Sequence, residues 1–556
     1  MSNFKLPISY LSDKSELDKS LYDDLQLLTG SKPLYKTIFN ADAKHNSLLL
    51  SEYSKYITKD KQYIKDTKKV ISGDLPNTPT DKTSILDVLD DIKKTKSKFK
   101  SKYGYLSWEF LEFINTNSTT LLLLFIYNIM APIFTVAMPI LLFIAPILVI
   151  LFNKESFNGT NYIRYLQVML KSHTLGSIFT LHELPLEKKI FTFLTILFYF
   201  YQIYTNFKAC FTYFENMRNL HKSLDTIKSY LNNTLPVLNK TIIKWKPFKS
   251  YQKFNNDTII VKNHVETLIK RLDNIQKLSL TPAKIANIGI TMDCWYSINN
   301  DPEIYKTLEY CTYFNCFIDN MCELKKQHNQ NKINFVELKS YTKFTNIRYA
   351  QLDSDKCIDN TIKLKQNAII TGPNASGKTT FIKSVLSSIL LSQQFGCGYY
   401  DKCCLDPYDN LFSYLNIPDT CDKNSLFQAE ATRCKNIIDI VSNNKDKRYF
   451  CMFDELFSGT NPEEAIITAT AYIQHLNSFS NVNYIITTHL VKVCENIDKD
   501  KNIENYKMDA EQSQDKLVYT YKLKKGISDI KGTSTVLGDL NYPTDIINKV
   551  NKISCS

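Results

Sequence analysis

A glycine-rich stretch about two-thirds of the way along the chain has the spacing of a phosphate-binding loop. In TGPNASGKTT, Gly372 and Gly377 are separated by four residues, and Lys378 and Thr379 follow directly. The apolar stretch NAIIT before it predicts a strand, and TTFIKSVLSSILLSQQF after it predicts a helix. Backbone N–H groups of such a loop and the helix N-terminus hold phosphates. Lys378 would reach the β- and γ-phosphates, and Thr379 would bind Mg²⁺.

A second motif supplies carboxylates at a strand end. In RYFCMFDELFSGTNPEEA an apolar strand ends in Asp454 and Glu455. We assign Asp454 to Mg²⁺ coordination and Glu455 to the general base that polarises the attacking water. A further strand, NYIITTHL, runs up to His489, which can hydrogen-bond the γ-phosphate or the water. Asp-Glu at a strand end can be a simple cap and a lone histidine is more often structural, but the loop upstream favours the catalytic interpretation.

The elements that must position these residues follow from the sequence pattern. After Phe335 strands alternate with helices up to the C-terminus, which predicts an α/β domain over residues 335–556. Ahead of it we expect a helical N-terminal region at 1–118, a transmembrane hairpin at 119–210 and a helical region at 211–334. The expected nucleotide-contacting residues of the loop are Gly372, Pro373, Asn374, Ala375, Ser376, Gly377, Lys378, Thr379 and Thr380.

The motifs together resemble the MutS family of DNA mismatch repair ATPases, a branch of the ABC ATPases. TGPNASGKTT, DELFSGT and TTH carry the resemblance, and NSLFQAEATRCKNII is similar to the family's Ser-x-Phe-x-x-Glu signature. The resemblance implies a dimeric ATPase that uses ATP and Mg²⁺ and binds DNA. It also implies that Ser425 touches the γ-phosphate held by the partner subunit. The closing segment, with Tyr542-Pro543 before a last helix, resembles the family's C-terminal helical dimerisation segment.

The sequence also departs from the family pattern. The chain leaves no room for an N-terminal mismatch-reading domain, and Ser458 replaces the arginine common after the carboxylate pair. Cys357 stands where an aromatic residue is expected to stack on adenine, and Tyr521 is a candidate for stacking from the other side. Nucleotide binding is therefore better supported by the residues than mismatch recognition.

A long uncharged run predicts a membrane segment. Leu121 to Phe152 contains no charged residue, and this run is longer than the roughly 18 residues that mark a transmembrane candidate. Pro132, Pro139 and Pro146 fall seven residues apart and are expected to kink the helix. A second stretch, Ile190 to Phe207, is interrupted by polar residues and gives a weaker signal.

Two crossings would form a hairpin that returns both flanks to the cytosolic side, where the ATPase domain is expected. Six lysines between Lys93 and Lys102, and Lys208, Arg218 and Lys222 after the second stretch, fit the positive-inside rule. If the first run is instead two short spans, the N-terminus changes side. The sequence does not choose between these alternatives.

Composition bears on two further questions, whether the protein has anionic partners and whether its cysteines bind a metal. The net charge of +12 comes almost wholly from lysine, with six arginines, and fits either biased composition or a surface for anionic partners such as nucleic acid or acidic lipid. All 14 cysteines lie at or after Cys210. Cys311, Cys316 and Cys322 lack spaced histidines, so we expect reduced thiols and no structural metal.

Two functions from different classes remain open. The first is a membrane-anchored, homo- or heterodimeric MutS-type ATPase that closes on DNA and is related to mismatch repair. The second is a membrane remodelling or scaffold ATPase that uses the same dimerisation cycle without DNA. ABC transport is disfavoured, because two spans per chain are few and no Leu-Ser-Gly-Gly-Gln signature is present.

Overall fold

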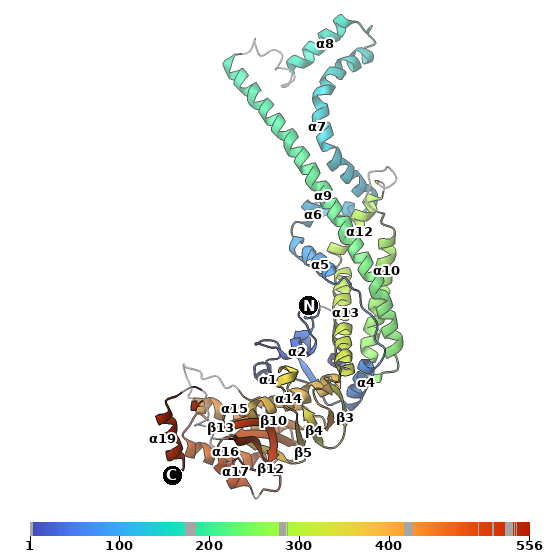
Figure 1. Cartoon of the computed structure of the whole chain (residues 1–556). Helices are drawn as coiled ribbons and strands as arrows, with labels where there is room; N and C mark the ends of the chain where they lie inside the picture. Colours follow the sequence, from blue (N-terminus) through green and yellow to red (C-terminus); the bar gives the residue numbers. More distant parts are fainter. Residues whose placement is uncertain are drawn as a thin grey trace. The chain divides into compact units, whose positions relative to one another are not determined.

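A computed structural model describes residues 4–172, 185–276, 285, 287–415, 426–498, 500–513, 516–528, 537, 538, 540 and 542–555. The chain forms two compact units, each described by itself below. Unit 1 comprises Met1–Thr80, Pro236–Lys262 and Tyr310–Ser556, and unit 2 comprises Asp81–Leu235 and Asn263–Glu309. The chain passes between the units four times, once between Thr80 and Asp81 and once within each of the helices α9 (Leu186–Trp245), α10 (Gln252–Asp273) and α13 (Pro302–Asn329) (Figure 1).

Unit 1 contains a six-stranded sheet of order β13-β12-β6-β11-β10-β9. Strands β9, β10, β11, β6 and β12 pair in parallel, and β13 adds an antiparallel edge. Its strands are β6 (Asn367–Thr371), β9 (Asn410–Tyr414), β10 (Tyr449–Asp454), β11 (Val482–Thr488), β12 (Ile503–Ser513) and β13 (Lys516–Lys525). Because the strands are parallel, β6, β10 and β11 end at one edge, which gathers the residues that follow each of them.

Helices cover both faces of this sheet (Figure 1). Side chains of β10 alternate between the faces: Tyr449, Cys451 and Phe453 join a core with helices α15, α16 and α17, while Phe450 and Met452 are buried on the other side. The helices of unit 1 that flank the sheet are α14 (Lys378–Phe395), α15 (Leu426–Asn443), α16 (Pro462–Leu476) and α17 (Val491–Ile497). The mixed α/β domain predicted after Phe335 is therefore present.

A second sheet of five strands lies in the same unit, with order β5-β4-β8-β3-β7. Only β3 and β8 pair in parallel; the other pairs are antiparallel. Its strands are β3 (Asn334–Leu338), β4 (Thr342–Ile347), β5 (Asn360–Leu364), β7 (Cys397–Gly398) and β8 (Lys402–Leu405). The last helix, α19 (Thr544–Cys555), directly follows Tyr542-Pro543, where the sequence predicts it.

The first 80 residues pack on the helix that follows the glycine-rich loop. They form short elements, and the two-stranded β1–β2 sheet among them corrects the all-helical expectation for this part of the chain. These elements are η1 (Pro7–Tyr10), β1 (Lys14–Glu16), α1 (Lys19–Asp24), α2 (Leu34–Ile38), α3 (Leu50–Tyr53), β2 (Tyr56–Thr58) and α4 (Lys61–Ser72). Two buried side chains of α14 hold them: Gln393 Nε2 donates to Thr58 O at 2.9 Å, and Gln394 Nε2 donates to Tyr53 O at 2.7 Å.

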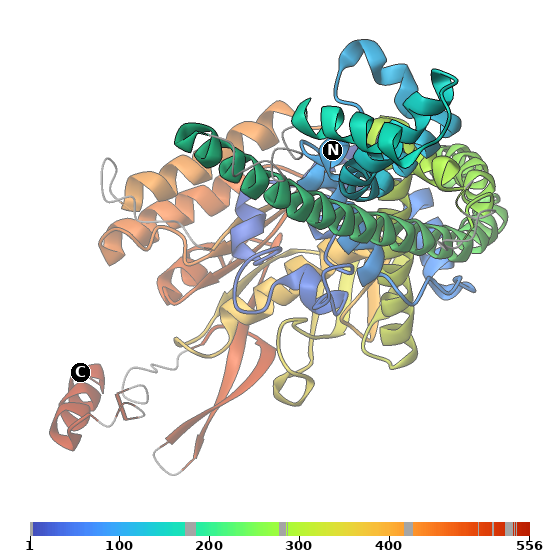
Figure 2. The ribbon, with the colours of Figure 1, turned by 90° about the horizontal axis from the view of Figure 1, so that it is seen from above.

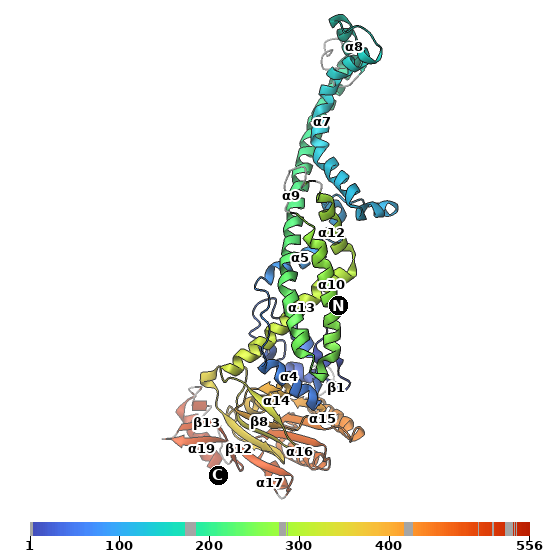
Figure 3. The same cartoon turned by 90° about the vertical axis from the view of Figure 1, so that its right-hand side faces the viewer.

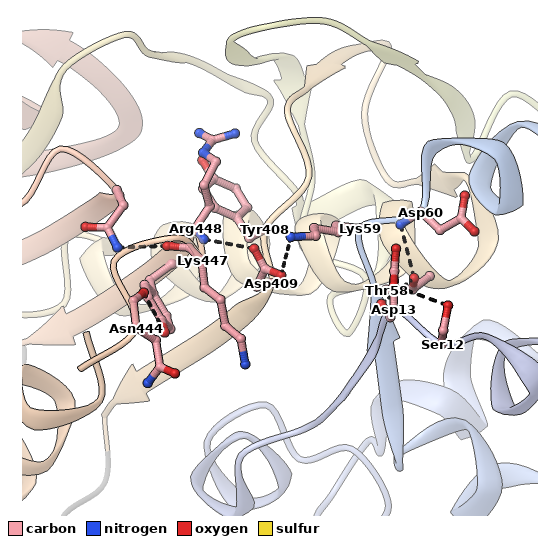
Figure 4. Close-up of polar contacts among 12 residues, drawn as sticks. Ser12, Asp13, Thr58, Lys59, Asp60, Tyr408, Asp409, Asn444, Lys447 and Arg448 are labelled. Carbon is pink, nitrogen blue, oxygen red and sulfur yellow. Dashed lines mark hydrogen bonds and ion pairs between the residues drawn. The ribbon is translucent and has the colours of Figure 1, made fainter. Parts of the chain in front are cut away.

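An ion pair beside these contacts extends the same packing. Lys59, next to the end of β2, lies 2.7 Å from a carboxylate oxygen of Asp409, and the backbone N–H of Arg448 donates to the other oxygen at 2.9 Å (Figure 4). Residues from the start of the chain and from the strands of the large sheet thus form one packed body.

Unit 2 is helical and includes α5 (Thr83–Thr95), α6 (Phe99–Lys102), η2 (Glu109–Thr116), α7 (Ser118–Phe152), α8 (Gly159–Ser172) and α12 (Ile288–Asn300). Helix α12 packs against the first turns of α7 (Figures 1 and 3). A Cβ on Gly289 would lie 1.9 Å from Ser118 O, so only glycine permits this approach.

The uncharged run of the sequence forms one continuous helix, α7, which is bent in Figure 1 as the three prolines predict. The second uncharged stretch forms part of the 60-residue helix α9, which Figure 2 shows running as one long rod. By length and composition, two helices of the described chain could cross a membrane, Ser118–Ala137 and Lys189–Trp245.

The pair α7 and α9 is joined by polar contacts among apolar surroundings. Tyr199 OH donates to the carbonyl of Thr135 at 2.5 Å, and Asn206 Nδ2 donates to Thr135 Oγ1 at 2.7 Å. The Thr135 carbonyl lacks its usual helical donor because Pro139, four residues later, has no N–H. Tyr199 therefore satisfies the acceptor that the proline leaves free.

Candidate functional site

The glycine-rich loop joins a buried strand to a buried helix. All residues of β6 are buried, and α14 begins at Lys378 directly after the loop. Gly377 has φ +92°, and a Cβ there would lie 3.0 Å from the ring of Tyr521. The left-handed backbone and the close ring together require glycine. Ala375 also has a positive φ, +64°.

Lys378 lies over the loop. Its Nζ donates to the carbonyls of Gly372 at 2.8 Å and Pro373 at 3.1 Å, and lies 3.9 Å from a carboxylate oxygen of Glu455. Burial lowers the pKa of Lys378 below its ordinary value, although Glu455 and Asp454 act in the opposite direction. The ammonium group therefore stands in a desolvated position where an anion would be strongly favoured.

Asp454 is held at the end of β10 by two hydroxyl groups. Thr379 Oγ1 donates to one carboxylate oxygen at 2.6 Å, and Thr487 Oγ1 donates to the other. The parallel register of β10 and β11 pairs Asp454 with Thr487. The Asp454 carboxylate and the Thr379 hydroxyl form a small set of hard oxygen ligands, the type that Mg²⁺ prefers when phosphates complete its shell.

Glu455 turns away from the strand in a constrained conformation. Its φ is +53°, which is costly for a non-glycine residue, and its N–H donates to Thr487 O at 3.0 Å. The Nδ1 of His489 lies 3.5 Å from its carboxylate. The hydrogen bond from His489 is the main cause that lowers the pKa of Glu455, with Lys378 adding to it against the effect of burial. The carboxylate is therefore ionised at neutral pH, as a general base requires.

Lys378, Thr379 and Glu455 line a cavity of about 560 Å³. Of the predicted nucleotide-contacting residues, Asn374 to Thr380 and Tyr521 line it, whereas Gly372 and Pro373 contribute the carbonyls that hold Lys378. The hydroxyl of Ser376 is buried without a hydrogen-bond partner among the described residues. An orphaned donor in the loop, beside a buried lysine, fits a phosphate group.

One wall of the cavity is apolar, and the sequence predicted only part of its residues. This wall consists of Ile347, Tyr349, Leu352, Cys357 and Ile358. Cys357 lines the cavity as expected, but Tyr349 supplies the aromatic ring on this side, and its N–H donates to Cys357 Sγ at 3.3 Å. Tyr521 lines the same cavity from β13. An aromatic residue eight positions ahead of Cys357 was the signal that sequence reasoning missed.

The signature segment begins at the edge of the described residues. Ser425 lies outside them, and α15 starts at Leu426. Glu430, which is buried, accepts hydrogen bonds from Ser458 Oγ at 2.9 Å and from the N–H of Gly459 at 3.2 Å. The signature glutamate thus fixes α15 to the segment after the carboxylate pair, and Ser458, in place of the expected arginine, is one of its donors.

A contact that sequence reasoning missed connects α15 to the start of the chain. The guanidinium of Arg433 lies 2.8 Å from Asp18, contacts the hydroxyl of Ser20, and donates to Ser413 O at 3.1 Å. Burial alone would raise the pKa of Asp18, but the hydrogen bonds from Ser20 and Arg433 lower it below its ordinary value. The partners are about 400 residues apart, so no local pattern could indicate them.

Comparison with known proteins identifies the C-terminal part of the chain. A family model described as MutS domain V matches residues 368–555. The chain is 26% identical over 201 residues to the DNA mismatch repair protein MutS of Prochlorococcus marinus, covering 36% of this chain and 21% of that protein. It is 32% identical over 195 residues to Endonuclease MutS2 of Clostridioides difficile, covering 34% and 23%. It is 28% identical over 191 residues to MutS protein homolog 4 of Mus musculus, covering 33% and 19%.

Residues 368–555 thus match MutS domain V, and this part of the chain carries the glycine-rich loop, the carboxylate pair and His489. The resemblance seen in the sequence motifs is thereby confirmed. The matches span about a fifth of the length of these relatives.

Proposed function

We propose that this protein binds ATP with Mg²⁺ and hydrolyses the γ-phosphate bond between two copies of its MutS domain V. The observation that carries the proposal is that Lys378, Thr379 and Glu455 line one cavity, while Asp454 contacts Thr379 and His489 contacts Glu455. These residues come from β6–α14, β10 and β11, so their convergence is a product of the fold and not of sequence proximity.

Each side chain has a defined role in this proposal. Lys378 leaves the loop carbonyls and donates to the phosphates, which compensates its buried charge. Thr379 and Asp454 hold Mg²⁺, which neutralises charge that develops on the phosphate oxygens. Glu455 accepts a proton from the attacking water, and His489 orients the carboxylate and the water.

We propose that the signature segment of one subunit completes the nucleotide site of the other. Following the family resemblance, Ser425 reaches the partner's γ-phosphate, and Glu430 keeps the start of α15 in place through Ser458 and Gly459. The partner is a second copy of this chain or a related chain. Closure of the two domains on ATP then supplies the mechanical step.

Nucleotide binding and turnover of purified protein test this proposal. Wild type should bind fluorescent ATP and release phosphate in the presence of Mg²⁺. Lys378→Ala should abolish binding, while Lys383→Ala, an alteration of a half-buried lysine on the same helix that does not line the cavity, should leave it unchanged. Ser425→Ala should lower turnover without weakening binding by the monomer. Equal binding by wild type and Lys378→Ala would reject the loop as the phosphate site.

We further propose that the protein acts on DNA in a process related to mismatch repair. The support is the family and the names of its relatives, among them a DNA mismatch repair protein. Filter binding of duplex and branched DNA across a salt series tests it, because phosphate contacts release counterions and make affinity fall with salt. Intact ATP turnover without DNA binding at low salt would instead favour the membrane remodelling or scaffold function.

We also propose that α7 and α9 anchor the protein in a membrane with the MutS domain V in the cytosol. The support is the surface of the two helices, on which large apolar side chains such as Ile133, Phe134, Leu197 and Phe198 are exposed. Alkaline extraction of membranes and protease accessibility of both termini test it. A protein that alkali releases, or whose termini lie on opposite sides, would contradict the anchored hairpin.

A further inference from the structure

Three large aromatic side chains stand exposed just before α7. Trp108, Phe110 and Phe113, in and beside η2, are 64%, 74% and 69% exposed. The rings of Trp108 and Phe110 stack at 5.8 Å with an interplanar angle of 9°. Burying such rings is worth far more than leaving them in water, so an exposed group of three indicates a contact surface. We call these residues the aromatic platform.

The aromatic platform is held rigidly. Asn115, which is buried, accepts from the N–H of Leu106 at 2.9 Å and donates to its carbonyl at 2.8 Å. Glu112 accepts from Tyr296 OH at 2.7 Å and pairs with Lys100 at 2.9 Å. The 3₁₀ turn is therefore tied to α6 and α12 of unit 2, and its aromatic side chains are presented outward by fixed backbone.

Positive charge accompanies the platform. The Lys100–Glu112 pair places α6 beside η2. Lys94 lies in the last turn of α5, and Lys96 and Lys98 lie between α5 and α6. These three lysines are exposed and make no ion pair within the described part of the chain. Of the acids near them in the sequence, Asp87 and Glu109 are exposed, while Asp91 and Glu112 pair with Lys102 and Lys100. The local excess is positive, which suits an anionic partner.

The apolar helices continue from this surface. In the first turns of α7, Leu121 and Phe125 are buried within unit 2, whereas Leu123 and Tyr127 are exposed. From Ile133 onward, large exposed apolar side chains predominate. On α9 the uncharged stretch ends at Phe207, which Lys208 follows, and the exposed Phe211 lies one turn further on. Since η2 ends at Thr116 and α7 begins at Ser118, the aromatic platform lies at the start of α7, and the Lys100–Glu112 pair places α6 and the lysines before it beside the platform.

We infer that the aromatic platform and Lys94, Lys96 and Lys98 bind the headgroup layer of a bilayer that contains anionic phospholipid. Trp and Phe side chains insert at the level of the headgroups, and lysines pair with lipid phosphates within a Debye length of the surface. The charge and the continuity with α7 favour this partner over a second copy of the chain. The inference rests on the proposed membrane anchoring and adds the lipid class and the residues that contact it.

Tryptophan fluorescence of full-length protein in vesicles of phosphatidylcholine and phosphatidylserine tests the inference. Of the three tryptophans, Trp245 and Trp295 are buried, so the difference between wild type and Trp108→Phe isolates the exposed one. Two reference tryptophans are introduced into Trp108→Phe: Leu197→Trp on the hairpin and Ile467→Trp on the exposed surface of α16. Acrylamide reports exposure to water, and lipids brominated at shallow or deep positions report depth.

We expect Trp108 to be quenched by shallow bromines, and its acrylamide quenching constant to be at least threefold below that of Trp at 467. Replacing Lys94, Lys96 and Lys98 by Gln should reduce this protection in anionic vesicles, while Gln at three other exposed lysines, Lys365, Lys445 and Lys492, should not. If the tryptophan at 197 is quenched by deep bromines but Trp108 remains as accessible as the one at 467, the inference is wrong and anchoring stands. If neither is quenched, anchoring itself fails. Protection of Trp108 that needs a second protein copy and no lipid would also overturn the inference.

Discussion

The ion pair between Arg433 and Asp18 gives a quantitative test of how the start of the chain stabilises α15. Arg433→Met keeps the apolar stem of the side chain but removes its bonds to Asp18, Ser20 and Ser413. Both charged side chains are 24% exposed, so the pair is neither fully buried nor freely solvated. Exposed pairs contribute about 0.2–1 kcal/mol and charged hydrogen bonds about 1.5–3 kcal/mol. We therefore expect Arg433→Met to lower the free energy of unfolding by about 2–3 kcal/mol.

A double-mutant cycle separates the pair from its surroundings. Asp18→Asn preserves the cap on α1, where the Asp18 side chain accepts from the N–H of Ser20, but removes the charge. Comparing both single variants with the double variant should give a coupling free energy of about 1–2 kcal/mol. Urea unfolding followed by the fluorescence of Trp245, the one tryptophan in unit 1, is a suitable assay.

The pH dependence of the coupling supplies a second check. The pKa of Asp18 is lowered in the folded protein, so its contribution to stability is complete above the ordinary carboxyl pKa. It should decrease as pH falls below the ordinary carboxyl pKa and be lost once pH has fallen through the lowered folded pKa. A coupling below about 0.3 kcal/mol at neutral pH, which is the scatter expected for independent sites, would refute the argument that this pair holds α15.

Three further outcomes are expected. Glu455→Gln should bind ATP but hydrolyse it at least a hundredfold more slowly, since general-base catalysis accelerates a reaction by about 10²–10⁴. Because the pKa of Glu455 is lowered, wild-type turnover in steady-state assays should fall only in the acid range, and a decline that starts near neutral pH would argue against this base. Tyr521→Ala should weaken nucleotide affinity several-fold in equilibrium titrations, while Tyr521→Phe should preserve it. The reason is that the Tyr521 ring, which lies beside Gly377, can stack on the adenine base without its hydroxyl group. Gly289→Ala should destabilise unit 2 by about 3 kcal/mol or more in thermal unfolding, because the new Cβ meets Ser118 O; an unchanged midpoint would mean that α12 and α7 do not approach as described.

Local patterns in the sequence were sufficient for much of this protein. The spacing of Gly372, Gly377 and Lys378 predicted a strand, a loop and a helix, and these are present because each depends on residues only a few positions apart. The uncharged run likewise predicted a helix, and its prolines predicted the bend of α7. The similarity of residues 368–555 to MutS domain V also followed from short motifs, because such motifs preserve backbone geometry and chemistry together.

Tertiary structure alone decided which distant residues meet. Thr487 on Asp454, Tyr349 in the cavity wall and Arg433 on Asp18 depend on strand order and on the packing of the first 80 residues, and neither is encoded in a local period. The same holds for the uncharged run itself: it is apolar throughout, yet Leu121 is buried in unit 2 while Ile133 is exposed. A run of apolar residues indicates that its side chains are unfavourable in water, and only the fold determines which of them other protein residues cover.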